Sequence, residues 1–172
     1  MKEIIIIGTV ALSGVRTVAD KKHNEIKMKY PERIIKKATS DTGYHTGVPG
    51  QLLPGKTLYA KEMGEGGLFT GLWHMAKDLK SGFSVDMRRI PVVQEAVEIC
   101  EMFNINPYNL ESGGSLLVVS EAAGEQLDLF TAENIKATRV GFLEASNDKK
   151  LLFGDRVRFL DKPAPDELRK IL

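Results

Sequence analysis

Runs of apolar residues in the first third of the chain predict a strand and a helix separated by polar sequence. Residues 4–7 are four successive isoleucines, a pattern typical of a strand buried on both faces of a sheet. Residues 31–38 predict a helix, because a proline stands in its first turn. Residues 39–56 are rich in glycine, proline, serine and threonine, which predicts a loop or hinge. This stretch is either a plain connector or a mobile functional loop.

Periodicity is clearer from residue 66 onward. Apolar residues recur at helical spacing between Leu68 and Leu79, and Gly82 ends that helix. Apolar and polar residues alternate over residues 83–87, which predicts a strand. A second helix follows Pro91, and its apolar positions, Val93, Ala96, Val97, Cys100 and Phe103, face inward.

The remaining third predicts more strands than helices. A turn and short helical segment over residues 104–110 lead to a buried strand at 115–120 and a helix at 123–133. Three strands follow at 138–144, 150–153 and 157–160. The last two form a hairpin, and a short helix closes the chain over 166–172.

This order predicts an α/β (α+β) domain, a mixed β-sheet with helices packed on it. We expect residues 61–172 to form the main domain. Residues 1–60 would add a strand, a helix and a connecting loop that pack on it.

Composition narrows the function classes. The chain has 172 residues, of which 42% are hydrophobic and 27% charged, and this composition suits one globular domain. Its net charge of +1 gives no reason to expect nucleic acid, a membrane or an acidic substrate as partner. The apolar run at 4–12 is too short for a membrane span and lacks a signal-peptide cleavage pattern. With a single cysteine, Cys100, we expect a cytoplasmic protein.

Four segments, in order, carry a resemblance to a known family. They are Glu65-Gly-Gly-Leu-Phe-Thr-Gly-Leu-Trp73, Ile90-Pro-Val-Val-Gln-Glu95, Ile99-Cys-Glu-Met-Phe-Asn-Ile-Asn-Pro-Tyr108 and Ser112-Gly-Gly-Ser-Leu-Leu117. They resemble the C-terminal domain of the superfamily of aminoimidazole ribonucleotide synthetase (AIR synthase), selenophosphate synthetase, thiamin-monophosphate kinase and the hydrogenase-maturation dehydratase. The hydrogenase-maturation-like branch is the most similar, and residues 4–19 more weakly resemble the piece that joins the two domains.

The resemblance implies ATP-using enzymes that activate an oxygen atom by phosphorylation and usually form homodimers of two-domain chains. Their N-terminal domain supplies most magnesium- and nucleotide-binding residues, and no such acidic cluster is visible here. Only the resemblance therefore suggests ATP and magnesium as ligands. We assign no catalytic residue and no metal ligand.

One departure from the family lies just before the predicted helix. The branch typically reads His-Asp-Val-Thr-Glu-Gly-Gly, whereas this chain reads Ala60-Lys-Glu-Met-Gly-Glu-Gly-Gly67. Glu65, Gly66 and Gly67 match the pattern, but the polar positions before them have become mixed and partly apolar. Catalysis of the family's kind is therefore in doubt at this place.

Two glycine-containing segments are the candidate binding sites. The predicted phosphate- or nucleotide-binding residues are Glu65, Gly66, Gly67, Ser112, Gly113 and Gly114. Free backbone N–H groups at a helix start or before a strand suit a phosphate. The alternative is purely structural: a tight turn in the first segment and a close crossing that tolerates no side chain in the second.

Other polar candidates are weaker. His23, His45 and His74 show no metal-binding spacing, and Cys100 is expected as a core residue. A last group of basic residues could meet a phosphate but more often forms a solvated helix edge: Lys77, Lys80, Arg88 and Arg89.

Three aromatic residues, Phe69, Trp73 and Phe103, could line a small-molecule pocket, although their helical spacing favours a place in the core. The strand at residues 4–7 needs cover on both faces. A second copy of the chain could give that cover, so we expect a homodimer.

Two functions from different classes follow. The chain is either a standalone, degenerate family domain that binds or regulates without catalysing alone, or one component of a split ATP-dependent synthetase or maturation enzyme. In the second case a separate chain carries the N-terminal domain. An excised fragment of a longer enzyme is a further alternative.

Overall fold

The protein is built on one seven-stranded mixed sheet. The computed structural model describes residues 1–40 and 52–172. The strands are β1 (Glu3–Ile7), β2 (Thr57–Met63), β3 (Gly82–Asp86), β4 (Ser115–Ser120), β5 (Ala137–Glu144), β6 (Lys149–Phe153) and β7 (Arg156–Phe159). Their order is β2-β4-β1-β5-β3-β6-β7, and every neighbouring pair is antiparallel except β3 and β6. The predicted α/β fold with a mixed sheet is confirmed.

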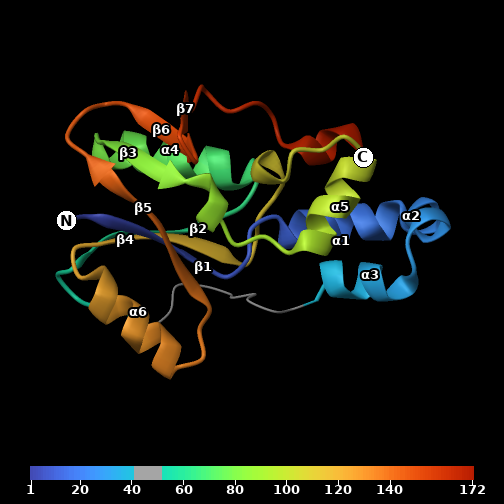
Figure 1. Cartoon of the computed structure of the whole chain (residues 1–172), viewed down its shortest axis with the longest axis horizontal. Coiled ribbons are helices and arrows are strands. Elements are labelled where there is room, and N and C mark those ends of the chain that lie inside the picture. Colours follow the sequence, from blue (N-terminus) through green and yellow to red (C-terminus); the bar gives the residue numbers. More distant parts are fainter. Residues whose placement is uncertain (41–51) are drawn as a thin grey trace.

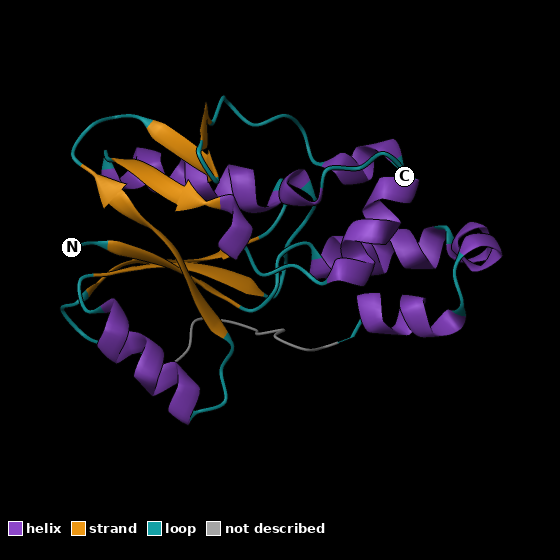
Figure 2. Cartoon of the chain, viewed as in Figure 1, coloured by secondary structure: helices purple, strands orange, loops and turns teal. Residues whose placement is uncertain are grey.

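The helices form two groups (Figure 1). They are α1 (Leu12–Lys21), α2 (His23–Lys29), α3 (Glu32–Ala38), α4 (Gly67–Leu79), α5 (Gln94–Met102) and α6 (Ala123–Ala132), with short 3-10 turns η1 (Met87–Arg89), η2 (Pro107–Asn109) and η3 (Glu167–Lys170). Helices α4 and α6 lie against the sheet. Helices α1, α2, α3 and α5 gather beyond one end of it, together with the C-terminus (Figure 2).

Strand β1 lies in the middle of the sheet, between β4 and β5. Its four isoleucines are fully buried. Ile4 and Ile6 pack under α4, whereas Ile5 and Ile7 pack on the opposite face with Phe130 of α6. The chain itself therefore covers both faces of β1, and the strand gives no reason to invoke a second copy. The division at residue 60 stays a prediction.

Most predicted elements are confirmed in place, and two regions were missed. Residues 57–63, unassigned from the sequence, form the edge strand β2. Residues 20–29, interpreted as a polar stretch, and residues 12–19, which had no assignment, form α1 and α2. Residues 41–51, which hold most of the predicted loop or hinge, lie outside the described residues.

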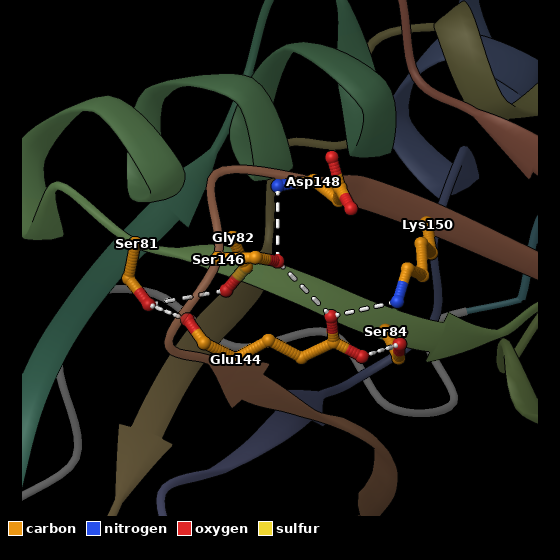
Figure 3. Close-up of polar contacts among 7 residues, drawn as sticks. All are labelled: Ser81, Gly82, Ser84, Glu144, Ser146, Asp148 and Lys150. Carbon is orange, nitrogen blue, oxygen red and sulfur yellow. Dashed lines mark hydrogen bonds and ion pairs between the residues drawn. The ribbon is translucent and has the colours of Figure 1, made fainter.

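A polar network around Glu144 ties three strands together at one side of the sheet (Figure 3). The Glu144 carboxylate accepts hydrogen bonds from the Ser84 hydroxyl and, at 3.0 Å, from Lys150 Nζ. Its backbone carbonyl accepts one from Ser81 Oγ at 2.6 Å. The hydrogen bonds from Ser84 and then Lys150 hold the pKa of Glu144 below its ordinary value. The network joins β5 to β3 and β6.

Candidate functional site

The two predicted glycine segments meet in the structure. The carbonyl of Gly64 accepts a hydrogen bond from Gly67 N at 3.0 Å and another from Ser112 N at 3.1 Å. A Cβ atom at Gly67 would lie 2.3 Å from the carbonyl oxygen of Leu110. Residues 66–67 and 112–114, which we call the glycine segments, therefore pack against each other and form a joint between the start of α4 and the start of β4.

The start of α4 requires glycine. Gly66 and Gly67 have φ angles of +83° and +65°, values that residues with a Cβ atom rarely adopt. The N–H of Gly66 points to the C-terminal segment, where it donates to Asp166 Oδ2 at 2.6 Å. Asp166 is only 5% exposed and also accepts from Leu168 N at 2.9 Å. A carboxylate of the chain itself thus stands at the positive end of the helix.

The backbone N–H groups of the second glycine segment, residues 112–114, are also hydrogen-bonded within the chain. Gly113 N donates to Ser13 Oγ, and Gly114 N donates to Glu62 Oε1, both at 2.8 Å. The buried Ser112 hydroxyl accepts from Ala11 N at 2.7 Å and donates to the carbonyl of the preceding turn. The predicted backbone donors are present, and oxygen atoms of this chain occupy them.

The surroundings of the joint are acidic. Glu65 is exposed and lies 3.4 Å from a guanidinium nitrogen of Arg169. Burial, and then the charges of Asp166 and Glu65, raise the pKa of the Glu111 carboxyl above its ordinary value. An anion entering here would meet three carboxyl groups, so it binds only by displacing one of the oxygen atoms already in place.

A pocket of about 290 Å³ adjoins the joint between β2 and α4. Lys61, Glu62, His74 and Asp78 line it, together with Gly64 and Glu65. Lys61 Nζ lies 2.7 Å from Asp78 Oδ2, and this hydrogen bond lowers the pKa of Asp78. This pocket therefore carries an exposed ion pair that joins β2 to the last turn of α4.

These residues do not fit a magnesium ion. The Asp78 carboxylate faces the Lys61 ammonium, and the Glu62 carboxylate accepts a backbone N–H. Across residues 1–40 and 52–172, no group of three or more His, Cys, Asp or Glu side chains could hold a metal.

The histidines and the cysteine are dispersed. His74 lines the pocket, His23 lies 3.8 Å from Glu32 at the other end of the molecule, and His45 is outside the described residues. Burial, reinforced by the charges of Glu167 and a neighbouring glutamate, raises the pKa of Cys100 to about 12. This thiol is protonated near neutral pH and is no nucleophile.

The aromatic residues considered together from the sequence are separated in space. Phe69 packs on Tyr108, with ring centroids 5.6 Å apart. Phe103 joins the cluster of α1 and α5, and the ring of Trp73 lies under Lys149. The three do not line one pocket.

Three residues at the joint were not predicted: Ser13, Glu62 and Asp166. They are 52 to 100 residues away from the N–H groups that they accept. No local pattern signals such contacts. Only the Asp166 side chain has a readable local role, because an aspartate commonly caps a short helical turn such as η3.

The class of protein is now defined: an α/β domain with a central mixed sheet, whose two glycine segments meet beside a pocket at the start of a helix. The chain belongs to the family "AIR synthase related protein, C-terminal domain", whose model matches residues 50–153. The family resemblance expected from the sequence is confirmed.

Solved structures with the same fold support this assignment. Escherichia coli HypE, described as a hydrogenase maturation protein, matches with a TM-score of 0.72 and 15% identity over 99% of this chain and 52% of that one. HypE in a HypE-HypF complex matches with a TM-score of 0.69 and 18% identity over 94% and 53%.

Thiamine-monophosphate kinase from Stenotrophomonas maltophilia matches with a TM-score of 0.61 and 17% identity over 84% and 48%. The chain thus spans about half the length of these structures. At such identities the likeness shows the fold. A search of curated proteins finds no match. Within the described ranges, no helix has the length and apolar character needed to cross a membrane.

Proposed function

We propose that this chain is a binding or regulatory module of the AIR synthase-related family and does not catalyse alone. The occupied glycine segments carry the proposal. The N–H groups of Gly66, Gly113 and Gly114 are donors of the kind that bind phosphate, and each holds an oxygen atom of the chain. A site that already binds carboxylate and hydroxyl oxygen suits an exchangeable anionic ligand.

Glu62 is the acceptor that a ligand would displace. Its side chain is exposed, whereas Asp166 is buried and makes two hydrogen bonds. Moving Glu62 away from Gly114 N returns its carboxylate to water and frees one backbone donor beside the pocket. The ligand we propose is a small phosphorylated metabolite that binds at Gly113 and Gly114.

Isothermal titration of the full chain with ATP, ADP and inorganic phosphate tests this function. Glu62→Ala removes the competing carboxylate, so we expect phosphate to bind more tightly by roughly tenfold. Glu133→Ala, an exposed glutamate beyond α6, is the matched control and should leave the affinity unchanged. ATP turnover by the purified chain alone would contradict the proposal.

A second candidate has its own observation. The chain spans 52% to 56% of the HypE structures that it matches, and one of these is described as HypE in complex with ATP. We propose, as the alternative, that the chain is one component of an ATP-dependent synthetase or maturation enzyme whose N-terminal domain lies elsewhere. Co-purification should then recover that partner. A monodisperse homodimer without such a companion would count against this alternative.

The homodimer itself also stays a proposal. Its support is now the family resemblance and the sheet edges, because β2 and β7 each pair on one side only among the described residues. Light scattering coupled to gel filtration measures the state directly. The single buried cysteine, Cys100, supports a cytoplasmic location.

A further inference from the structure

An open groove at the C-terminal half of α4 is lined by four lysines and by the single tryptophan of the chain. Its volume is about 580 Å³. Trp73, Lys77 and Lys80 come from α4 and its C-cap, Lys149 from β6 and Lys162 from the segment after β7. We call these five residues the lysine groove. Among the described residues, no Asp or Glu lines it.

The lysines of the groove make no short ion pair, although the charge of Lys77 acts on Asp78 at longer range. None of the four lysines has an ion-pair partner in the described parts of the chain, whereas the nearby Lys61 lies within 2.7 Å of a carboxylate. Lys149 Nζ lies 5.0 Å from the centroid of the Trp73 ring, a cation–π contact that holds the ammonium over the indole. In a chain whose net charge is only +1, this concentration of positive charge is local.

A helix dipole explains only part of this arrangement. Lys77 and Lys80 stand at the C-terminal end of α4, where cations are favoured. Lys149 and Lys162 come from other elements and have no such reason to be there. They add two cations to the groove that already holds Lys77 and Lys80, so an anion bound there would be attracted by all four lysines.

We propose that the lysine groove binds an oligophosphate chain. Four ammonium groups match a compact ligand with several negative charges, and lysine suits phosphate as a point charge with three donors. Lys149 already covers a face of the ring, so recognition rests on the phosphates and not on an aromatic base. The site lies at the opposite end of α4 from Gly66 and Gly67.

The sole tryptophan makes the test direct, because fluorescence excited at the long-wavelength edge of the indole band, where the four tyrosines do not absorb, reports on Trp73 alone. Sodium tripolyphosphate should change this fluorescence saturably, and added salt should weaken the binding. Lys149→Gln/Lys162→Gln should lower the affinity by roughly tenfold or more. Lys21→Gln/Lys36→Gln changes the net charge equally at exposed positions on α1 and α3, and should stay within about twofold of the parent chain.

The second part of the fluorescence experiment compares ATP with tripolyphosphate. ATP that binds as tightly as tripolyphosphate, or more tightly, supports a site for the phosphate chain. ATP binding without tripolyphosphate binding overturns the proposal. So does an absent response to tripolyphosphate at millimolar concentration, or an equal loss in both double variants. Failure here is distinct from failure at the glycine segments, because Glu62→Ala should change the calorimetric phosphate titration without altering the response of Trp73.

Discussion

The two ends of α4 treat charge in opposite ways. At its start, the glycine segments bring polar groups together and pair them inside the chain, with Asp166 on Gly66 N and Glu62 on Gly114 N. At its other end, the lysine groove holds four cations without an ion-pair partner among the described residues. The first region has the recognisable motif and the second has none. A sequence motif can therefore mark a place where the polar groups are already paired. The unpaired charges of the lysine groove lie instead on lysines that belong to no common motif.

Physical chemistry accounts for the difference. The joint is buried, and a buried N–H without an acceptor costs about 1–3 kcal/mol, so folding recruits acceptors from distant segments. The groove is open to solvent, where an unpaired ammonium stays hydrated and costs little. Stability should therefore depend on the glycine segments and hardly at all on the lysine groove. Four measurements can break or sharpen this contrast.

Gly67→Ala should have the largest effect. Its Cβ would lie 2.3 Å from the carbonyl oxygen of Leu110, in a backbone conformation of φ +65° that alanine rarely adopts. We expect a loss of about 3 kcal/mol in the free energy of unfolding, measured by urea denaturation. Gly64→Ala is the control, since a Cβ there meets no atom within 4 Å, and equal losses would contradict the proposed joint.

Asp166→Ala should be next. It removes the acceptor of two backbone donors, Gly66 N and Leu168 N, in a buried place. The expected loss is about 2 kcal/mol in the same denaturation experiment. Asp166→Asn keeps one oxygen acceptor and should lose less. An Asn variant as unstable as the Ala variant would show that the side-chain oxygen is not what matters.

The Glu144 network should show its effect through pH. The pKa of Glu144 is lower in the folded than in the unfolded protein, so the unfolded state binds more protons between the two values. The stabilisation is complete above the unfolded pKa, near the ordinary value of 4.5, and is lost as the pH falls through the folded one. Thermal unfolding across the acidic range should show a shallower decline for Glu144→Gln. An unchanged slope would exclude this role.

Lys149→Gln/Lys162→Gln should have the smallest effect. Because neither lysine has an ion-pair partner among the described residues, the free energy of unfolding should change by no more than about 0.5 kcal/mol. Lys150→Gln, one position along β6, deprives Glu144 of a hydrogen bond and should destabilise more. A large loss in the double variant would mean that the groove is structural.

The fold was largely predictable because strong periodicity agrees with tertiary structure. The isoleucine run gave β1, and the spacing from Leu68 to Leu79 gave α4. Helix α1 was missed because Gly14 weakens its pattern. In the structure that glycine makes room for Leu110, whose Cγ would lie 2.4 Å from an added Cβ. Edge strand β2 was missed because only Tyr59 and Met63 of its seven residues are buried.

The candidate sites were less predictable. The sequence singled out both glycine segments, and the structure places them together, but their acceptors lie on distant segments. Similarly, Lys77 and Lys80 were grouped with Arg88 and Arg89 by proximity along the chain. Both arginines instead pair with Asp86. Basic residues that are close along the sequence are therefore not the ones that lie close together in the structure.

The position of β1 also sets the order in which the molecule can assemble. Both neighbours of this strand, β4 and β5, lie more than a hundred residues further along the chain. During synthesis, both edges of the four isoleucines can therefore be paired only after residues 137–141 of β5 have left the ribosome. Until then the isoleucines form an exposed, aggregation-prone apolar segment on an incomplete chain. Slow translation or early arrest should direct this protein toward chaperones or aggregates long before any ligand can act on it.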